Sequence, residues 1–201
     1  MKTFSKAVIA ALVFGGSVSA ANAGGVITNI SALDTSGGIF NSGLITDHNI
    51  DLDKTFTSIN PISLTFTVAH TDGGGNPYSV AESILNNTGV AWTDFHYSIN
   101  EPDRGQGVVF TQFNTGSTLD GFTLDSAPSS GPRNLNFTGN LAAGDSTNAA
   151  FSISPFDPGA GNTATFVLTQ VPTIPEPGTY AMLLAGLLLM GGIAKRKGMF
   201  S

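Results

Sequence analysis

The sequence has no cysteine and little charge. Without cysteine, disulfide frameworks, cysteine zinc sites and thiol catalysis are excluded. Charged residues make up only 11% of the chain. Between residues 24 and 177 there are three cations, Lys54, Arg104 and Arg133, against 14 acidic residues, a net charge of −11. A body this acidic repels phosphates, so we expect no nucleic-acid partner.

Small and turn-forming residues are abundant instead. The 201 residues include 25 glycines and 10 prolines among many Thr, Ser and Asn. This composition favours turn-rich β structure over a helical bundle, and the length fits about one domain.

The amino terminus has the three parts of a secretory signal peptide. A short basic region, Met1 to Lys6, precedes an apolar stretch, Ala7 to Gly16, and the segment closes on Ala21-Asn22-Ala23. Small residues at these positions are what signal peptidase requires. We therefore predict a signal peptide over 1–23, cleaved after Ala23, with Ala20 as the alternative.

The carboxyl terminus has an apolar run followed by cations. No charge occurs from Tyr180 to Ala194, and Lys195, Arg196 and Lys197 follow. A helix of this run would span ~22 Å, short of the ~30 Å hydrocarbon core. Extending it to 178–194, with the cations reaching the headgroups, makes a short transmembrane helix feasible. The basic end would stay cytoplasmic.

A proline-rich linker precedes this helix. The prolines of Val171 to Pro177 exclude a helix there, so the linker is extended. The order of Pro175-Glu176-Pro177, a short helix containing Gly186, Gly191 and Gly192, and the basic stop Lys195-Arg196-Lys197 resembles the PEP-CTERM sorting signal of Gram-negative bacteria. The same tail is also called an ice-binding protein C-terminal domain, a name that implies no activity.

The resemblance implies processing by exosortase, a membrane transpeptidase. It implies that the protein is exported, held in the inner membrane before processing, and then attached to the cell surface or released into the extracellular matrix of a bacterium that makes exopolysaccharide. The sorting segment would occupy 174–201.

The body between the two ends, 24–173, has recurrent strand signals. Apolar residues alternate with hydroxyl or polar residues in Ile62 to Val68 and in Asp94 to Ile99, and shorter apolar runs occur at 108–110, 122–124 and 165–168. Turn clusters separate them. The pattern predicts an antiparallel β-sandwich. Ser79 to Leu85 could instead be one or two helical turns.

One body segment, NNTGVAWTDFHYSI, resembles a recurrent stretch of secreted PEP-CTERM proteins. Asn87-Thr88-Gly89 predicts a turn, and Trp92 is either a core anchor or an exposed aromatic residue. A carbohydrate-binding module is the alternative function. It would need an exposed platform of Trp92 with Tyr97 or Tyr78.

Metal and cofactor signals are weak. Asp47, Asp51 and Asp53 place oxygen ligands at alternate positions as a calcium loop does, but Leu52 stands where the loop needs glycine and Ser58 where it needs glutamate. His48, His70 and His96 form no short ligand pair. We expect no metal and no cofactor.

Catalysis has no positive signal. Glu82 and Glu101 are the only glutamates of the body, and a glycosidase would need two carboxylates about 5 to 9 Å apart in a cleft. No Gly-x-Ser-x-Gly motif occurs. Thr55-Phe56-Thr57 and Thr65-Phe66-Thr67 resemble the threonine ladders of ice-binding surfaces, but alternation in any strand produces such pairs.

We therefore expect a non-enzymatic exported protein, handled by signal peptidase and exosortase and associated with exopolysaccharide or biofilm. A secreted hydrolase and an ice-binding protein are the less favoured alternatives.

Overall fold

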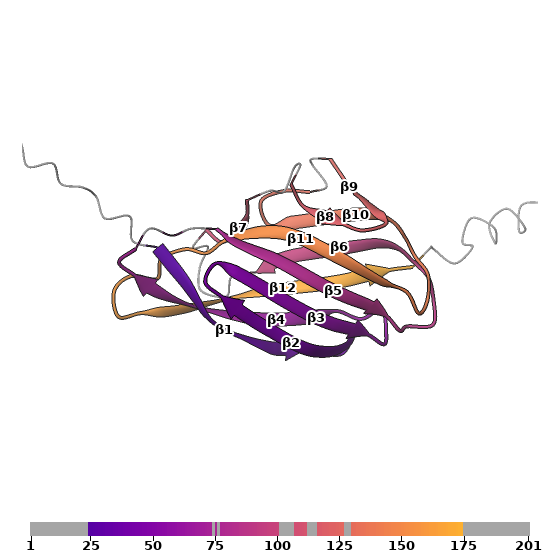
Figure 1. Ribbon diagram of the computed structural model, residues 1–201, viewed down its shortest axis with the longest axis horizontal. Helices are drawn as coiled ribbons and strands as arrows, with labels where there is room; N and C mark the ends of the chain where they lie inside the picture. Colours follow the sequence, from indigo (N-terminus) through magenta and orange to yellow (C-terminus); the bar gives the residue numbers. More distant parts are fainter. Residues whose placement is uncertain are drawn as a thin grey trace, which may run out of the picture.

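A computed structural model describes residues 24–73, 75, 77–100, 107–111, 116–126 and 130–174. These residues form twelve strands and no helix, arranged in two six-stranded sheets (Figure 1). The predicted all-β body is confirmed. The expected signal peptide, 1–23, and the expected transmembrane helix, 178–194, lie outside the described residues.

Sheet A contains both the first and the last of the described strands. Its strand order is β1 (Gly24–Asp34), β4 (Ile62–Thr71), β12 (Thr163–Thr173), β6 (Trp92–Asn100), β10 (Asn134–Leu141) and β9 (Phe122–Leu124). All of its strand pairs are antiparallel. The last strand, β12, is central, because it pairs with β4 on one side and β6 on the other.

Sheet B contains one pair that the sequence did not predict. Its order is β2 (Gly38–Thr46), β3 (Asn49–Phe56), β5 (Tyr78–Asn86), β11 (Ser146–Ser154) and β7 (Val109–Phe110), and β8 (Thr118–Leu119) also pairs with β11. Strands β3 and β5 are parallel, so the expectation of a purely antiparallel sandwich is wrong. The intervening strand β4 belongs to sheet A and runs back along the molecule, so the chain re-enters sheet B in its original direction.

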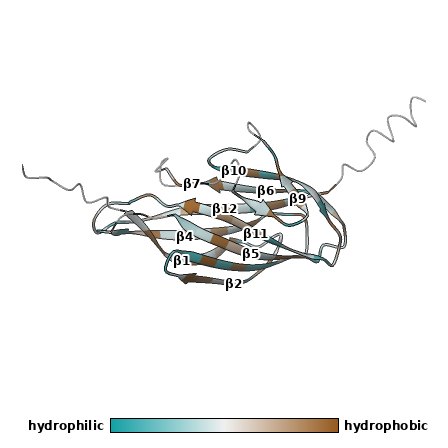
Figure 2. Ribbon diagram, turned by 45° about the horizontal axis from the view of Figure 1, so that its top comes forward, coloured by the Kyte–Doolittle hydropathy of each residue, from teal (hydrophilic) through white to brown (hydrophobic). Residues whose placement is uncertain are grey.

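The core lies between the sheets and is rich in aromatic rings. Phe66 and Phe166 stack with centroids 4.7 Å apart, and Phe56 meets Trp92 edge-on at 5.3 Å. Both geometries are favourable for aromatic pairs. Along the strands, apolar and polar residues alternate (Figure 2), so each sheet turns one apolar face inward.

The segment Ser79 to Leu85, for which helical turns were an alternative, lies within strand β5. Val80, Glu82 and Ile84 point inward in strict alternation, while Ser79, Ala81 and Ser83 are exposed. The glutamate at an inward position broke the apolar period, which is why the strand was not recognised.

Candidate functional site

The sorting residues adjoin the described body. Pro175, Glu176, Pro177, Lys195, Arg196 and Lys197 lie outside the described residues. Strand β12 ends at Thr173, and Ile174 packs against the core. The start expected for the linker, Val171, is therefore wrong, because Val171, Pro172 and Thr173 pair with β6 as the end of β12.

The residues of the expected signal-peptidase site also adjoin the described body. Ala21 and Ala23 lie outside the described residues, and β1 begins at Gly24, directly after the expected cleavage point. Figure 1 shows that β1 starts at one end of the long axis and β12 finishes at the other. The strand register agrees with this view. Gly24, the first residue of β1, pairs with Thr71 at the end of β4, and Thr163, the first residue of β12, pairs with Ala69 close by. Both strands therefore start at the same end of the molecule, and β12 finishes at the other end.

The three aspartates weighed for calcium do not form a closed site. Asp47 occupies the tight β2–β3 turn with a φ of 53°, and Asp51 and Asp53 are exposed on β3. Asp53 Oδ1 accepts a hydrogen bond of 2.6 Å from Asn41 Nδ2. Within the described residues no group of three His, Asp or Glu side chains is suited to hold a metal.

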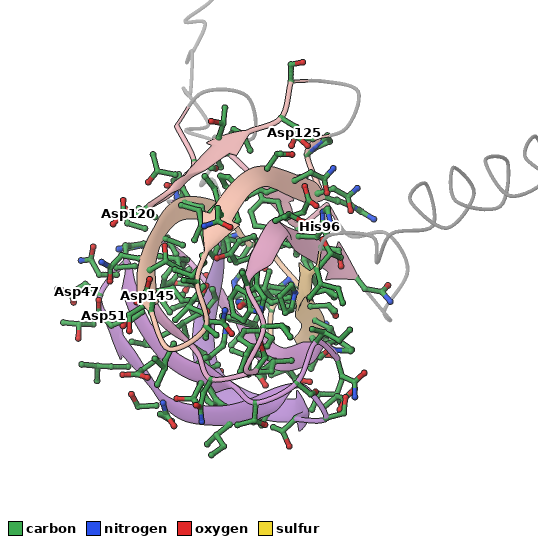
Figure 3. All side chains as sticks on the ribbon, turned by 90° about the vertical axis from the view of Figure 1, so that its right-hand side faces the viewer. Asp47, Asp51, His96, Asp120, Asp125 and Asp145 are labelled. Carbon is green, nitrogen blue, oxygen red and sulfur yellow. The ribbon has the colours of Figure 1, made fainter. Side chains whose placement is uncertain are left out.

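The three histidines are also separate. The His48 ring packs on Tyr78 with centroids 5.1 Å apart, and His96 Nδ1 lies 2.9 Å from Asn136 Oδ1. Figure 3 shows His96 on the opposite side of the molecule from Asp47 and Asp51.

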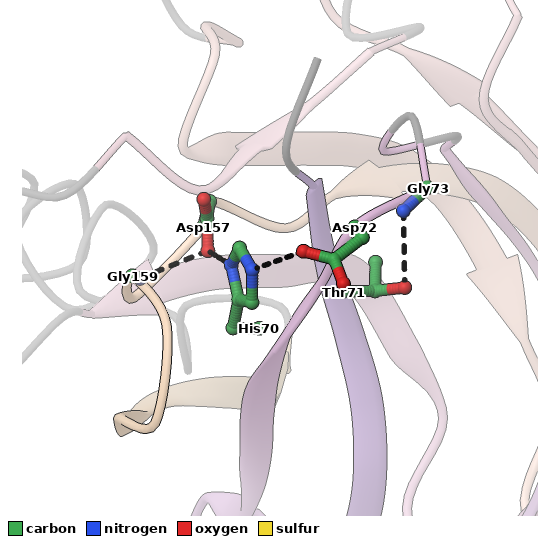
Figure 4. A network of polar contacts seen from close by, with 6 residues as sticks. All are labelled: His70, Thr71, Asp72, Gly73, Asp157 and Gly159. Carbon is green, nitrogen blue, oxygen red and sulfur yellow. Dashed lines mark hydrogen bonds and ion pairs between the residues drawn. The ribbon is translucent and has the colours of Figure 1, made fainter. Parts of the chain in front are cut away.

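His70 instead ties a loop to strand β4. Its Nδ1 lies 2.8 Å from Asp157 Oδ1 and its Nε2 3.1 Å from Asp72 Oδ1, and Asp157 Oδ1 accepts a hydrogen bond from the Gly159 amide (Figure 4). The hydrogen bonds to Asp157 and Asp72 raise the pKa of His70. The hydrogen bond to His70 lowers the pKa of Asp157. The arrangement fixes the β11–β12 loop and leaves neither ring nitrogen for a metal.

The aromatic residues of the proposed carbohydrate platform are buried. Trp92 is 0% exposed, and Tyr78 and Tyr97 are each 1% exposed. A sugar cannot stack on rings that are closed off by the two sheets. The aromatic-platform form of the carbohydrate-binding alternative is therefore wrong, and Trp92 is a core residue.

The turn before Trp92 is held by a single buried amide. Asn86 Nδ2 donates to the carbonyl oxygens of Val90, Leu141 and Ala142 at 2.9, 3.2 and 3.1 Å. Its Oδ1 accepts from the backbone amide and the hydroxyl of Thr88. Gly89, at a φ of 79°, completes the predicted turn. Asn86 thus joins this turn to the end of β10.

The two threonine pairs do not form one surface. Thr55 lies on β3 in sheet B, whereas Thr65 and Thr67 lie on β4 in sheet A. Phe56 and Phe66 between them are buried. The alternation of ordinary strands accounts for both pairs, and an ice-binding face made from the two together is excluded.

The core contains a buried ion pair that the sequence did not reveal. Lys54 Nζ of β3 contacts Glu82 Oε1 of β5, and both side chains are fully buried. Tyr97 Oη of β6 donates a hydrogen bond of 3.0 Å to Glu82 Oε2. Burial lowers the pKa of Lys54, although the carboxylate opposes that effect. Burial, and then the neighbouring Glu82, raise the pKa of Tyr97 well above its ordinary value.

A second buried polar group, Gln170, is next to Tyr97 in the sheet. Gln170 of β12 is 0% exposed and is the register partner of Tyr97. Neither its amide nitrogen nor its amide oxygen has a hydrogen-bond partner within the described part of the chain. A buried amide without partners costs stability, so its presence calls for an explanation.

The outer face of sheet B carries a groove of ≈ 650 Å³. Three aspartates border it, Asp51 and Asp53 from β3 and Asp120 next to β8, and small side chains such as Ala81 and Ala150 form its floor. Glu82 also borders the groove, but its side chain is buried on the other side of the sheet. A hydrolase would need the Glu82 carboxylate beside an aspartate in an open cleft. The buried Glu82 side chain does not form that arrangement.

Comparison with known proteins identifies the tail. The family model described as the PEP-CTERM protein-sorting motif matches residues 173–197. No curated protein and no solved structure matches the chain. The chain carries a PEP-CTERM sorting motif, and this motif begins at the last residue of β12.

Proposed function

We propose that this protein is an exported, non-catalytic component of the cell surface or extracellular matrix of a Gram-negative bacterium. It is cut by signal peptidase after Ala23, held in the inner membrane by the apolar segment 178–194, and then processed by an exosortase-type transpeptidase. The sorting-motif match at 173–197 carries the proposal. That motif indicates export, a membrane-anchored stage before processing, and delivery to the surface.

The position of the motif supports this order of events. The described body begins at Gly24 and its final strand ends at Thr173, so the sandwich fits between the two addressing segments. From the sequence, we expect the prolines of the linker to keep the peptide after β12 extended. An extended peptide next to a membrane is a form that a processing enzyme can bind and cut.

Glu176 is the residue that we assign to recognition. It is the only charged residue between Asp157 and Lys195. A carboxylate in a neutral linker is suited to a cationic pocket, because charge-assisted hydrogen bonds are stronger than neutral ones. A marginal transmembrane helix would hold the linker beside the enzyme long enough for cleavage.

The test is to follow the mass of the membrane-associated form in the native host. Glu176→Ala should block processing while export continues, so the unprocessed form should accumulate. Glu101→Ala, which removes a glutamate of the body without touching the motif, serves as the control and should be processed normally. Trimming of Glu176→Ala at the parental rate would refute the assignment.

For the body we propose association with exopolysaccharide through the sheet B groove. Its aspartates and the neighbouring Asn148 supply acceptors and donors for sugar hydroxyls, and its small floor side chains leave room for a chain to lie on the sheet. No cation lies among the residues that line it, so an uncharged polysaccharide fits better than an acidic one.

This association can be measured by co-sedimentation with the exopolysaccharide purified from the host. A variant with Asp51→Asn and Asp120→Asn should bind at least several-fold more weakly. Asp125→Asn, in which the substituted carboxylate bonds to Thr138 on sheet A, should bind as the parent does. Equal sedimentation of all three proteins would show that the groove is not the contact.

A further inference from the structure

We propose that Lys54 and Glu82 become joined by an intramolecular amide bond that cross-links strands β3 and β5. The two side chains already touch within the core and share it with a hydroxyl group able to assist the reaction. The bond would be a self-catalysed modification that needs no reactant from outside.

The sheet places the two groups for reaction. In the parallel β3–β5 pair, Leu52 faces Glu82 and Lys54 faces Ile84, so Lys54 and Glu82 are diagonal neighbours on the inner face. Both side chains are 0% exposed and in contact. Fixing two reactants in one geometry can supply an effective concentration of ~10⁵ M or more.

The surroundings keep water away from the pair. Tyr97, which bonds to Glu82, packs between Phe95 and Phe151 with ring centroids 5.1 and 5.0 Å away. An ion pair in such a place is costly, because desolvating both charges can exceed their mutual attraction. Conversion to an amide removes both charges and leaves a neutral group that the core tolerates better.

The chemistry balances within the cluster. Proton transfer inside the ion pair gives a neutral Lys54 amine and a neutral Glu82 carboxyl, and burial favours that form by lowering the pKa of Lys54. Nζ attacks Cδ, while the Tyr97 hydroxyl donates to Oε2 and stabilises the oxyanion. Nζ then loses a proton to the departing hydroxyl. One C–N bond forms, one C–O bond breaks, and one water leaves without any oxidation or reduction.

Gln170 is the competing acceptor. Its amide is buried without a hydrogen-bond partner in the described residues and lies next to Tyr97 in register. Attack by Lys54 on Gln170 would release ammonia and join β3 to β12. We favour Glu82, because the structure shows its carboxylate in direct contact with Lys54.

Tryptic digestion of the unfolded protein decides the matter. Lys54 is the only lysine between Lys6 and Lys195, and Arg104 is the next cleavage site. An amide on Lys54 blocks trypsin there, so the exported protein should give one peptide running through Lys54 to Arg104, lighter than its sequence mass by one water. Fragmentation should place the bond at Glu82.

Two variants test the assignment. Glu82→Leu should restore cleavage after Lys54, because it removes the only carboxyl group that contacts the amine in the described residues. It also leaves the buried Lys54 without its partner, which destabilises the fold. Glu101→Gln changes the other glutamate of the same peptide and should keep the bond. Tyr97→Phe should slow bond formation at least several-fold after synthesis, since it keeps the ring but removes the donor.

Each other outcome overturns the proposal. Complete cleavage after Lys54, with both peptides at their sequence masses, means that Lys54 and Glu82 are only an ion pair. A product joined to the peptide that starts at Asn134, lighter by one ammonia, assigns the bond to Gln170 instead. These results come from the parent protein alone, so they stand even if Glu82→Leu does not fold.

Discussion

Replacing Asn86 with Asp should destabilise the protein more than its near-identical size suggests. The change keeps an oxygen for Thr88 but removes the donor to the carbonyls of Val90, Leu141 and Ala142. The amide nitrogen has two hydrogens, which the three carbonyl oxygens share, so at about 1 kcal/mol for each lost hydrogen bond the expected loss is about 2 kcal/mol. That is a large share of the roughly 5 to 15 kcal/mol by which domains are stable. The melting temperature should fall by about 4 to 8 °C.

The effect should depend on pH in a defined direction. An ionised carboxyl facing three carbonyl oxygens is disfavoured, so the introduced group has a folded-state pKa above its unfolded value of about 3.9. Stability is then retained below the unfolded pKa and lost as the pH rises through the folded pKa. The difference between Asn86→Asp and the parent should widen from acidic to neutral pH.

The assay is urea unfolding followed by fluorescence. Trp92 is the single tryptophan and is fully buried, so its emission reports the opening of the sandwich. Asn87→Asp makes the same chemical change at the exposed neighbouring position and controls for added negative charge. An Asn86→Asp midpoint equal to that of Asn87→Asp at every pH would refute the role given to the Asn86 amide.

Two further outcomes are expected. Millimolar calcium should leave the melting temperature nearly unchanged, because Asp47, Asp51 and Asp53 form no closed site; a rise of several degrees that disappears in Asp47→Asn would contradict this. NMR titration should give His70 a pKa above its ordinary value of about 6.5, and Asp157→Asn should lower it. The stability that His70 contributes is present below its ordinary pKa and is lost as the pH rises through the raised pKa. The stability that Asp157 contributes is lost instead in acid, as the pH falls through its lowered pKa. A His70 pKa that does not respond to Asp157→Asn would contradict the pairing.

The sequence predicted those features that depend on neighbouring residues. Alternation placed β4 and β6, and the linear order of residues in the tail identified the sorting motif, since a linear motif can be recognised from residue order alone. The burial of Trp92 could not be settled in advance, because an aromatic residue on a strand suits both a core and a sugar platform.

The buried ion pair depends on distant residues and was missed for that reason. Lys54 and Glu82 are 28 positions apart, and strand β4 between them belongs to the other sheet. Only the parallel β3–β5 pairing brings them together, and no local pattern specifies that pairing. Glu82 also made β5 hard to predict from the sequence, because a polar residue at an inward position breaks the alternation of apolar and polar residues on which strand prediction relies.

The central position of β12 has a consequence for the timing of folding. Until this strand arrives, sheet A consists of two separate parts, β1–β4 on one side and β6–β10–β9 on the other. The chain emerges from its amino end, so β12 is the last strand to leave the export channel, immediately followed by the sorting motif at 173–197. We therefore expect the sandwich to close only when the residues of the sorting motif follow β12 out of the channel. A chain that ended before β12 would lack the strand that joins the two parts of sheet A, and it would also lack the sorting motif. Folding and sorting therefore both depend on the segment that begins with β12.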